Sequence, residues 1–223
     1  MLMLPESVNL HELIDVVITT LDARDPYTYE HSFRVAQYAE IIAYDMGLSK
    51  MACQSIHIAA HLHDIGKIGV QDRVLNKGGK LTTEEMLDMQ AHSRIGANIL
   101  KRTSIFQEIS DIALYHHERF DGLGYPTGLK GDAIPLESRI IAVVDSFDAM
   151  TSNRPYRQGM QAEAAANEIF HHNNQQFCPI IVKHFQKIFD QLLPYINGTA
   201  ETLADHYAFV GHEDLMHSKI VHQ

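Results

Sequence analysis

The sequence has no tryptophan, only two cysteines and no long hydrophobic run. Cys53 and Cys178 lie far apart and do not form a Cys-x-x-Cys pair, so the sequence predicts neither a disulfide framework nor a zinc site built from thiolates. Nowhere do about eighteen apolar residues follow one another, and the first residues lack a basic stretch that leads into an apolar one. We therefore expect a cytoplasmic protein that does not enter a membrane.

Positive charge is also scarce. The chain has 18 lysines and arginines against 28 aspartates and glutamates, a net charge of −10 with histidines neutral. Such a balance disfavours general attraction to a nucleic-acid polymer or to an anionic membrane surface. A phosphate substrate would need a local positive site. Histidine, in contrast, is abundant: the chain has 15, and imidazole is a common metal ligand that titrates near neutral pH.

The pattern of apolar residues predicts an all-α protein. Apolar residues recur at spacings of three and four, with few alternating runs, and 223 residues with 45% hydrophobic content can bury the core of one domain. Thr82 and Glu85 form a capping-box signature, and residues 66–81 before them are expected to form a long loop. The expected helices cover residues 8–23, 28–47, 49–64, a segment from 82, 105–117, 135–152, 162–172 and 179–193.

Several side chains are candidates for a metal site. Asp64 follows His63 near the end of an apolar helix, and Asp145 follows five apolar residues. A carboxylate in such surroundings is costly unless it is paired, caps a helix or binds a metal. Histidine and aspartate together offer ligands suited to first-row transition ions, although an isolated His-Asp pair is more often a surface feature or a helix-end hydrogen bond. The other candidates are His31, His92, His116 and His117.

Two segments resemble the signatures of the HD-GYP family. His63-Asp64-Ile65-Gly66-Lys67 is similar to the first, and His116-His117-Glu118-Arg119-Phe120-Asp121-Gly122-Leu123-Gly124-Tyr125-Pro126 is similar to the second, longer one. The resemblance covers about residues 25–189. It implies an all-α HD-domain helical bundle with a central dinuclear metal site. It also implies a phosphodiesterase that hydrolyses cyclic di-GMP through a metal-bridged hydroxide, with linear pGpG or GMP as the final product.

The resemblance also implies a division of ligands. One metal would be held by His31, His63, Asp64 and Asp145; Asp64 would bridge to a second metal, completed by His92, His116 and His117. The family usually contains iron or manganese, and this ligand set permits either. Some members have a glutamate four residues before the first histidine that enables a third metal, but Tyr27 stands there in this chain, so two divalent transition ions are predicted.

Further residues are candidates for substrate binding. Lys67 would neutralise a phosphate oxygen in the transition state, and its alternative role is structural, at a helix end. Arg154 and Arg157 lie three residues apart and would share a helix face toward a second phosphate; the alternative is a solvated charged face. Tyr125 would stack or hydrogen-bond near the substrate, or simply fix its loop. His57 and His61 share one predicted helix but match no ligand position of the family.

The resemblance leaves substrate and context open. The alternative functions are a phosphodiesterase for 3′,3′-cyclic GMP-AMP and a catalytically silent module that binds a cyclic dinucleotide or a partner. We divide the chain into an N-terminal helix at residues 1–24, interpreted as the end of a linker from a domain outside this sequence, a catalytic domain at 25–195 and a C-terminal extension at 196–223. Expected partners are the cyclic dinucleotide, another signalling domain or protein at the Gly-Tyr-Pro loop, and a second copy in a homodimer.

Overall fold

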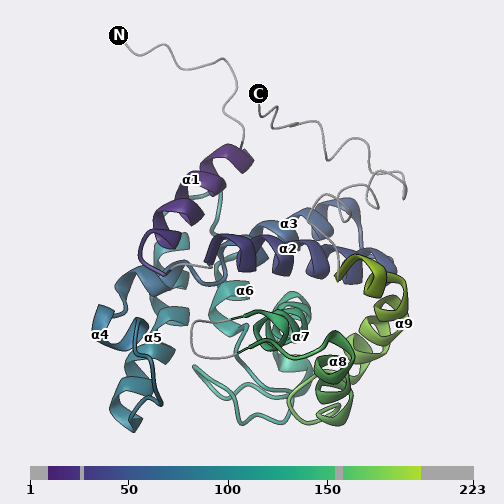
Figure 1. The fold of residues 1–223 in the computed structure, drawn as a ribbon. Coiled ribbons are helices and arrows are strands. Elements are labelled where there is room, and N and C mark those ends of the chain that lie inside the picture. Colours follow the sequence, from purple (N-terminus) through teal and green to yellow (C-terminus); the bar gives the residue numbers. More distant parts are fainter. Residues whose placement is uncertain (1–9, 26–27, 154–157, 197–223) are drawn as a thin grey trace, which may run out of the picture.

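The computed structural model describes residues 10–25, 28–153 and 158–196, with side chains described up to residue 189. Within these ranges the chain forms α-helices and two short 3₁₀ helices, and no strand, which confirms the predicted all-α class (Figure 1). No helix in this part of the chain is both long and apolar enough to cross a lipid bilayer.

The first three helices form one packed unit. Helix α1 spans Leu10–Asp22, α2 spans Thr28–Asp45 and α3 spans Lys50–Leu62. Helix α1 packs on both α2 and α3, and α2 and α3 also pack against each other. Ser49 begins α3, because its side chain accepts a hydrogen bond from the backbone N–H of Ala52. This unit places His31 on α2 and His63 just after α3.

The segment expected as a long loop carries two short helices instead. The 3₁₀ helix η1 spans Ile65–Gly69 and α4 spans Asp72–Leu75. Bonds between residues three apart, such as those from the N–H of Lys67 and Val70 to preceding carbonyls, hold the tight turns. Because this segment contains several glycines, the pattern of apolar residues did not predict these turns. Helix α5 then spans Thr83–Leu100, and the predicted capping box at Thr82 is confirmed.

The helix predicted from residue 105 begins later in the structure than expected. Helix α6 spans Ser110–Tyr115, so the prediction of a helix from residue 105 was wrong for its first turn. Residues 103–110 are joined by hydrogen bonds between residues three apart, which form tight turns rather than an α-helix; Ile105 is 65% exposed, while Phe106 and Ile109 pack against the core. The short helix η2 spans Gly131–Ala133, and α7 spans Leu136–Thr151.

Helix α7 lies at the centre of the fold. It contacts α2, α3, α6, α8 and α9, and Figure 1 shows it surrounded by these elements. Its apolar face is fully buried, with Ile141, Val144 and Phe147 each at most 1% exposed. Helices α8, Ala162–His171, and α9, Pro179–Ile196, cover one side. The division at residues 25 and 196 stays a prediction, and residues 197–223 lie outside the described part.

Helix η1 approaches α5 very closely at a glycine. A Cβ atom at Gly66 would lie 1.8 Å from the carbonyl oxygen of His92 and 2.4 Å from the backbone nitrogen of Gly96. Backbone atoms cannot move aside as flexible side chains do, so only glycine fits at position 66. This approach brings the residues around Asp64 next to His92.

We predict that Gly66→Ala destabilises the fold. The added methyl group must push η1 away from α5, and overpacking of this kind costs about 1–3 kcal/mol, so the urea midpoint should fall. Gly79→Ala is the matched control, because a Cβ atom there meets nothing within 4 Å. Equal urea midpoints for the two variants would show that the η1 contact does not constrain the fold.

Candidate metal centre

The seven candidate ligands lie together at the meeting point of five elements. They form two groups in which one potential ligand atom per residue lies within 4.8 Å of the others. His31 is on α2 and Asp145 on α7, while His63 follows α3 and His92 is on α5; His116 and His117 follow α6. The groups are His31, His63 and Asp145, and Asp64, His92, His116 and His117.

Asp64 lies between the two groups. Its Oδ2 atom is 3.4 Å from Nε2 of His63 and 3.9 Å from Nε2 of His31, whereas its Oδ1 atom is 3.4 Å from Nε2 of His92. One carboxylate thus presents a different oxygen to each group. This is the arrangement that a bridging ligand requires, and it matches the division implied by the sequence resemblance.

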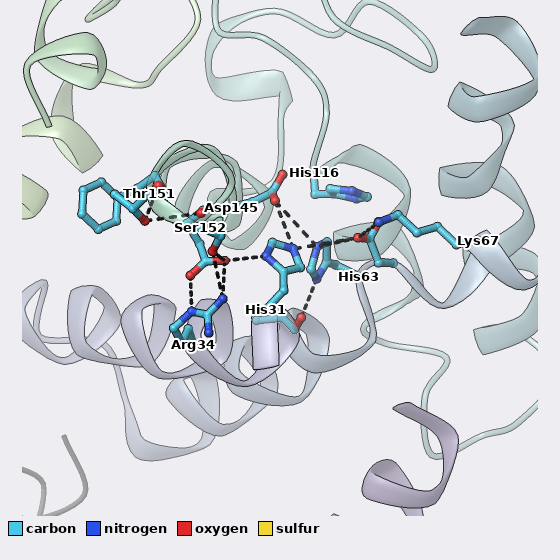
Figure 2. Close-up of polar contacts among 12 residues, drawn as sticks. His31, Arg34, His63, Lys67, His116, Asp145, Thr151 and Ser152 are labelled. Atoms are coloured by element: carbon cyan, nitrogen blue, oxygen red, sulfur yellow. Dashed lines mark hydrogen bonds and ion pairs between the residues drawn. The ribbon is translucent and has the colours of Figure 1, made fainter. Parts of the chain in front are cut away.

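Asp145 and His31 hold one side of the centre. Oδ1 of Asp145 lies 3.3 Å from Nε2 of His31 (Figure 2). Burial opposes protonation of His31, but contacts with Asp145 and Asp148 outweigh burial and raise its pKa to about 9. Burial likewise opposes ionisation of Asp145, yet His31 holds the pKa of Asp145 below its ordinary value. These carboxylates therefore favour a positive charge between them, which either a proton or a metal ion supplies.

The backbone orients three of the other histidines. Nδ1 of His63 donates to the carbonyl of Ala60 at 2.6 Å, and His92 and His116 make the same bond to the carbonyl three residues earlier, at 2.7 and 2.6 Å. A proton on Nδ1 leaves the lone pair on Nε2, so these rings present an acceptor nitrogen to the centre.

A network of polar side chains on the Nδ1 side of His31 orients the ring of this histidine. Asp148, only 1% exposed, accepts a bond of 2.8 Å from Nδ1 of His31 and one of 2.5 Å from Nε of Arg34. Ser152 donates to the same carboxylate at 3.1 Å, as Figure 2 shows. The sequence analysis did not identify Arg34 as part of this network. Arg34 could have been found from its position three residues after His31, on the same face of the helix.

The second group of histidines is neutral at physiological pH. Burial, with a contribution from His92, lowers the pKa of His117 to about 4, and burial with the neighbouring His117 lowers the pKa of His116. Nε2 of His63, in the first group, is buried and makes no hydrogen bond among the described residues. Neutral imidazoles, and a buried nitrogen that lies near carboxylates without a hydrogen bond, fit divalent transition ions.

Lys67 places its ammonium group at the edge of the centre. Its Nζ atom lies 2.9 Å from Oδ2 of Asp64 and 3.1 Å from Oδ2 of Asp25. Burial opposes its charge, but the two carboxylates outweigh burial and raise the pKa of Lys67. The lysine is therefore charged and lies beside the candidate bridging ligand.

The glycine-rich loop is anchored against the second group. The ring of Tyr125 lies 4.7 Å from that of His117, with 30° between the ring planes. Glu118, 3% exposed, accepts bonds from the backbone N–H groups of Thr127 and Gly128. Sequence reasoning gave no role to Glu118. Arg154, Arg157 and Tyr27 lie outside the described residues.

Comparisons with known proteins identify this arrangement. The profile of the HD domain family matches residues 15–180. The chain belongs to the HD domain family. Among solved structures, this HD domain is similar to a cyclic GMP-AMP-specific phosphodiesterase of Vibrio cholerae, with a TM-score of 0.66 and 22% identity over 88% of this chain and 52% of that one. That likeness supports the fold.

Curated relatives match this HD domain more strongly in sequence. A cyclic di-GMP phosphodiesterase of Thermotoga maritima is 44% identical over 80% of this chain and 49% of its own length. A 3′3′-cGAMP-specific phosphodiesterase of Vibrio cholerae is also 44% identical, over 65% of this chain and 32% of its own length. The chain thus spans about half the length, or less, of these relatives.

We predict that Asp148→Asn weakens metal binding. The amide keeps the size of the carboxylate but loses the charge that orients His31, and loss of such outer contacts typically costs about 10–100-fold in affinity. Competition with a chelator would measure this change, and circular dichroism would check the fold. Asp111→Asn is the control, because its ion pair with Lys101 is exposed. Affinities within twofold of each other would refute an orienting role for Asp148.

Proposed function

We propose that this HD domain is a metal-dependent phosphodiesterase that hydrolyses cyclic di-GMP to linear pGpG, with GMP as the alternative final product. The observation that carries the proposal is the convergence of seven histidine and aspartate side chains on one centre, with the two oxygens of Asp64 facing separate groups. His31, His63, Asp64 and Asp145 would hold one ion, and Asp64, His92, His116 and His117 a second. Iron or manganese is the proposed content.

The proposed reaction adds water across one phosphodiester bond. A water oxygen bonds to phosphorus, the bond between phosphorus and the 3′ oxygen breaks, and the proton lost by the water is balanced by one gained at that oxygen. The bound ions would supply positive charge to the phosphate oxygens and ease the deprotonation of water. The protein holds the ligand nitrogens in place through the Nδ1 bonds of His31, His63, His92 and His116.

Lys67 is proposed to stabilise the charge that develops on the phosphate. Its ammonium group is fixed between Asp64 and Asp25, so little reorganisation is needed when the charge grows. Asp25 is therefore a positioning residue for Lys67. Arg154 and Arg157 are proposed to bind the second phosphate, and Tyr125, whose ring lies against His117, to contact the substrate beside the second group.

A second substrate is supported by sequence similarity. A Vibrio cholerae relative named for 3′3′-cGAMP is as identical to this chain as the Thermotoga maritima relative named for cyclic di-GMP. A silent binding module is less favoured, because all seven candidate ligands are retained. A partner at the Gly-Tyr-Pro loop, where Leu123 is 78% exposed, stays a prediction, as do a homodimer and a cytoplasmic location.

The proposal is tested by anaerobic purification, metal analysis and hydrolysis assays with iron- or manganese-loaded protein. At least two tightly bound transition ions per chain are expected, with cleavage of cyclic di-GMP; parallel assays with 3′,3′-cyclic GMP-AMP decide the preferred substrate. Asp64→Ala should abolish both metal retention and cleavage. Folded, metal-loaded protein that cleaves neither compound would overturn the proposal in favour of a binding module.

Lys67→Gln tests the proposed role of the ammonium group. Loss of a charge fixed beside the reacting phosphate should lower kcat about 100-fold, while the metal content stays that of the wild type. Lys101→Gln removes an exposed lysine that pairs with Asp111 and should leave kcat unchanged. If Lys67→Gln changes only the thermal stability, the lysine is structural.

A further inference from the structure

Two adjacent residues that follow α1, Arg24 and Asp25, both contact η1. Asp25 accepts a bond of 3.1 Å from Nζ of Lys67, the middle residue of η1. Nη1 of Arg24 donates to the carbonyl of Ile68, and its Nη2 donates to the carbonyl of Val70 at 2.8 Å. One short segment therefore holds both the side chain of Lys67 and the backbone that follows it.

The backbone of this segment is anchored on α1. The N–H groups of Arg24 and Asp25 both donate to the carbonyl of Leu21, at 2.9 and 3.0 Å. Leu21 is buried in the core, and α1 also packs directly on η1. Both side chains therefore start from a point whose distance to η1 is set by the packing of α1.

Arg24 supplies hydrogen-bond donors that η1 needs at its carboxyl end. The last carbonyls of a helix lack partners within it, and the hydrogen bonds of 3₁₀ turns have poor geometry. A guanidinium group carries five N–H donors in a planar fork, so it can donate to two carbonyls at once. The competing interpretation is a surface ion pair, because Nη2 of Arg24 also lies 2.5 Å from Oδ1 of Asp72, an exposed side chain. Such a pair contributes little to stability and does not account for the bond from Nη1 to a backbone carbonyl.

Helix η1 is thus held at both ends. At its start, Gly66 lies so close to α5 that a Cβ atom would meet backbone atoms. At its end, Arg24 bonds the carbonyl groups. Lys67 lies between these two contacts, and its Nζ atom is 2.9 Å from Oδ2 of Asp64. Without the contact at the carboxyl end, the backbone of Lys67 could shift relative to Asp64.

We propose that Arg24 is a positioning residue for the reaction: it fixes the carboxyl end of η1 and thereby holds the ammonium group of Lys67 beside Asp64. This inference rests on the proposed phosphodiesterase function, which gives Lys67 its role toward the phosphate. The side-chain bonds that Arg24 makes to other described residues reach none of the candidate metal ligands. Arg24 therefore acts through Lys67 and not through metal binding.

The test is a double-mutant cycle of Arg24→Gln and Lys67→Gln in the metal-loaded full chain, with cyclic di-GMP as substrate. Arg24→Gln alone should lower kcat about tenfold, with KM and metal content close to those of the wild type, because a small misplacement of a reacting group costs rate. On the Lys67→Gln background, the same substitution should change kcat by less than about twofold, since the group that Arg24 positions is already absent. Arg73→Gln removes an exposed arginine of α4 and is the matched control, which should leave kcat unchanged.

Hydrogen exchange gives a second readout that does not depend on activity. The N–H groups of Lys67 and Val70 close the turns of η1. In Arg24→Gln these amide hydrogens should exchange faster than in the wild type, whereas in Arg73→Gln they should exchange at the wild-type rate.

The outcomes separate the two proposals. An equal fold-loss of kcat on the wild-type and Lys67→Gln backgrounds would overturn the action of Arg24 through Lys67. Unchanged exchange in η1 would overturn the hold of Arg24 on its carboxyl end. Wild-type protein that cleaves neither cyclic dinucleotide would overturn the proposed function and, with it, the catalytic effect of Arg24, while the exchange result would still decide whether Arg24 constrains η1.

Discussion

Two carboxylates with little access to water, those of Asp64 and Asp145, set the main constraint on this fold. Negative charge in such surroundings is tolerated only beside positive charge or a bound cation. Helices that are distant in sequence therefore meet at this centre, where they bring imidazoles and one ammonium group to these oxygens. The preference of His31 for a proton and the fixed position of Lys67 are consequences of this requirement.

The sequence predicted most of the helices because their apolar faces repeat regularly. The two signatures mark four of the candidate ligands, His63, Asp64, His116 and His117, whereas His31, His92 and Asp145 lie outside them. The predictions from the sequence were wrong where the structure depends on contacts that leave no periodic pattern in the sequence. Helix η1 contains glycines and short turns, and the segment before α6 is held by hydrogen bonds between residues three apart. The network of Arg34 and Asp148 joins α2 to α7 across 114 positions of sequence, which no local pattern reveals.

Signature residues outside the proposed ligand set have physical roles of their own. Gly66 allows backbone to touch backbone between η1 and α5. Gly124 does the same within its loop, since a Cβ atom there would lie 2.3 Å from the backbone nitrogen of Arg119. Glu118 satisfies backbone donors of the same loop. The signatures thus describe backbone geometry as much as ligand chemistry.

The adjacent residues His63 and Asp64 depend on where α3 ends. In a continuous α-helix, neighbouring side chains point about 100° apart. Here Leu62 is the last residue of α3 and η1 begins at Ile65; His63 keeps helical dihedral angles, Asp64 leaves them, and Nε2 of His63 lies 3.4 Å from Oδ2 of Asp64. A designer who copied this dipeptide into the middle of a regular helix would retain both residues but lose the turn into η1 that begins at Asp64 (φ −97°, ψ 6°), and that turn is itself part of the proposed metal-binding motif.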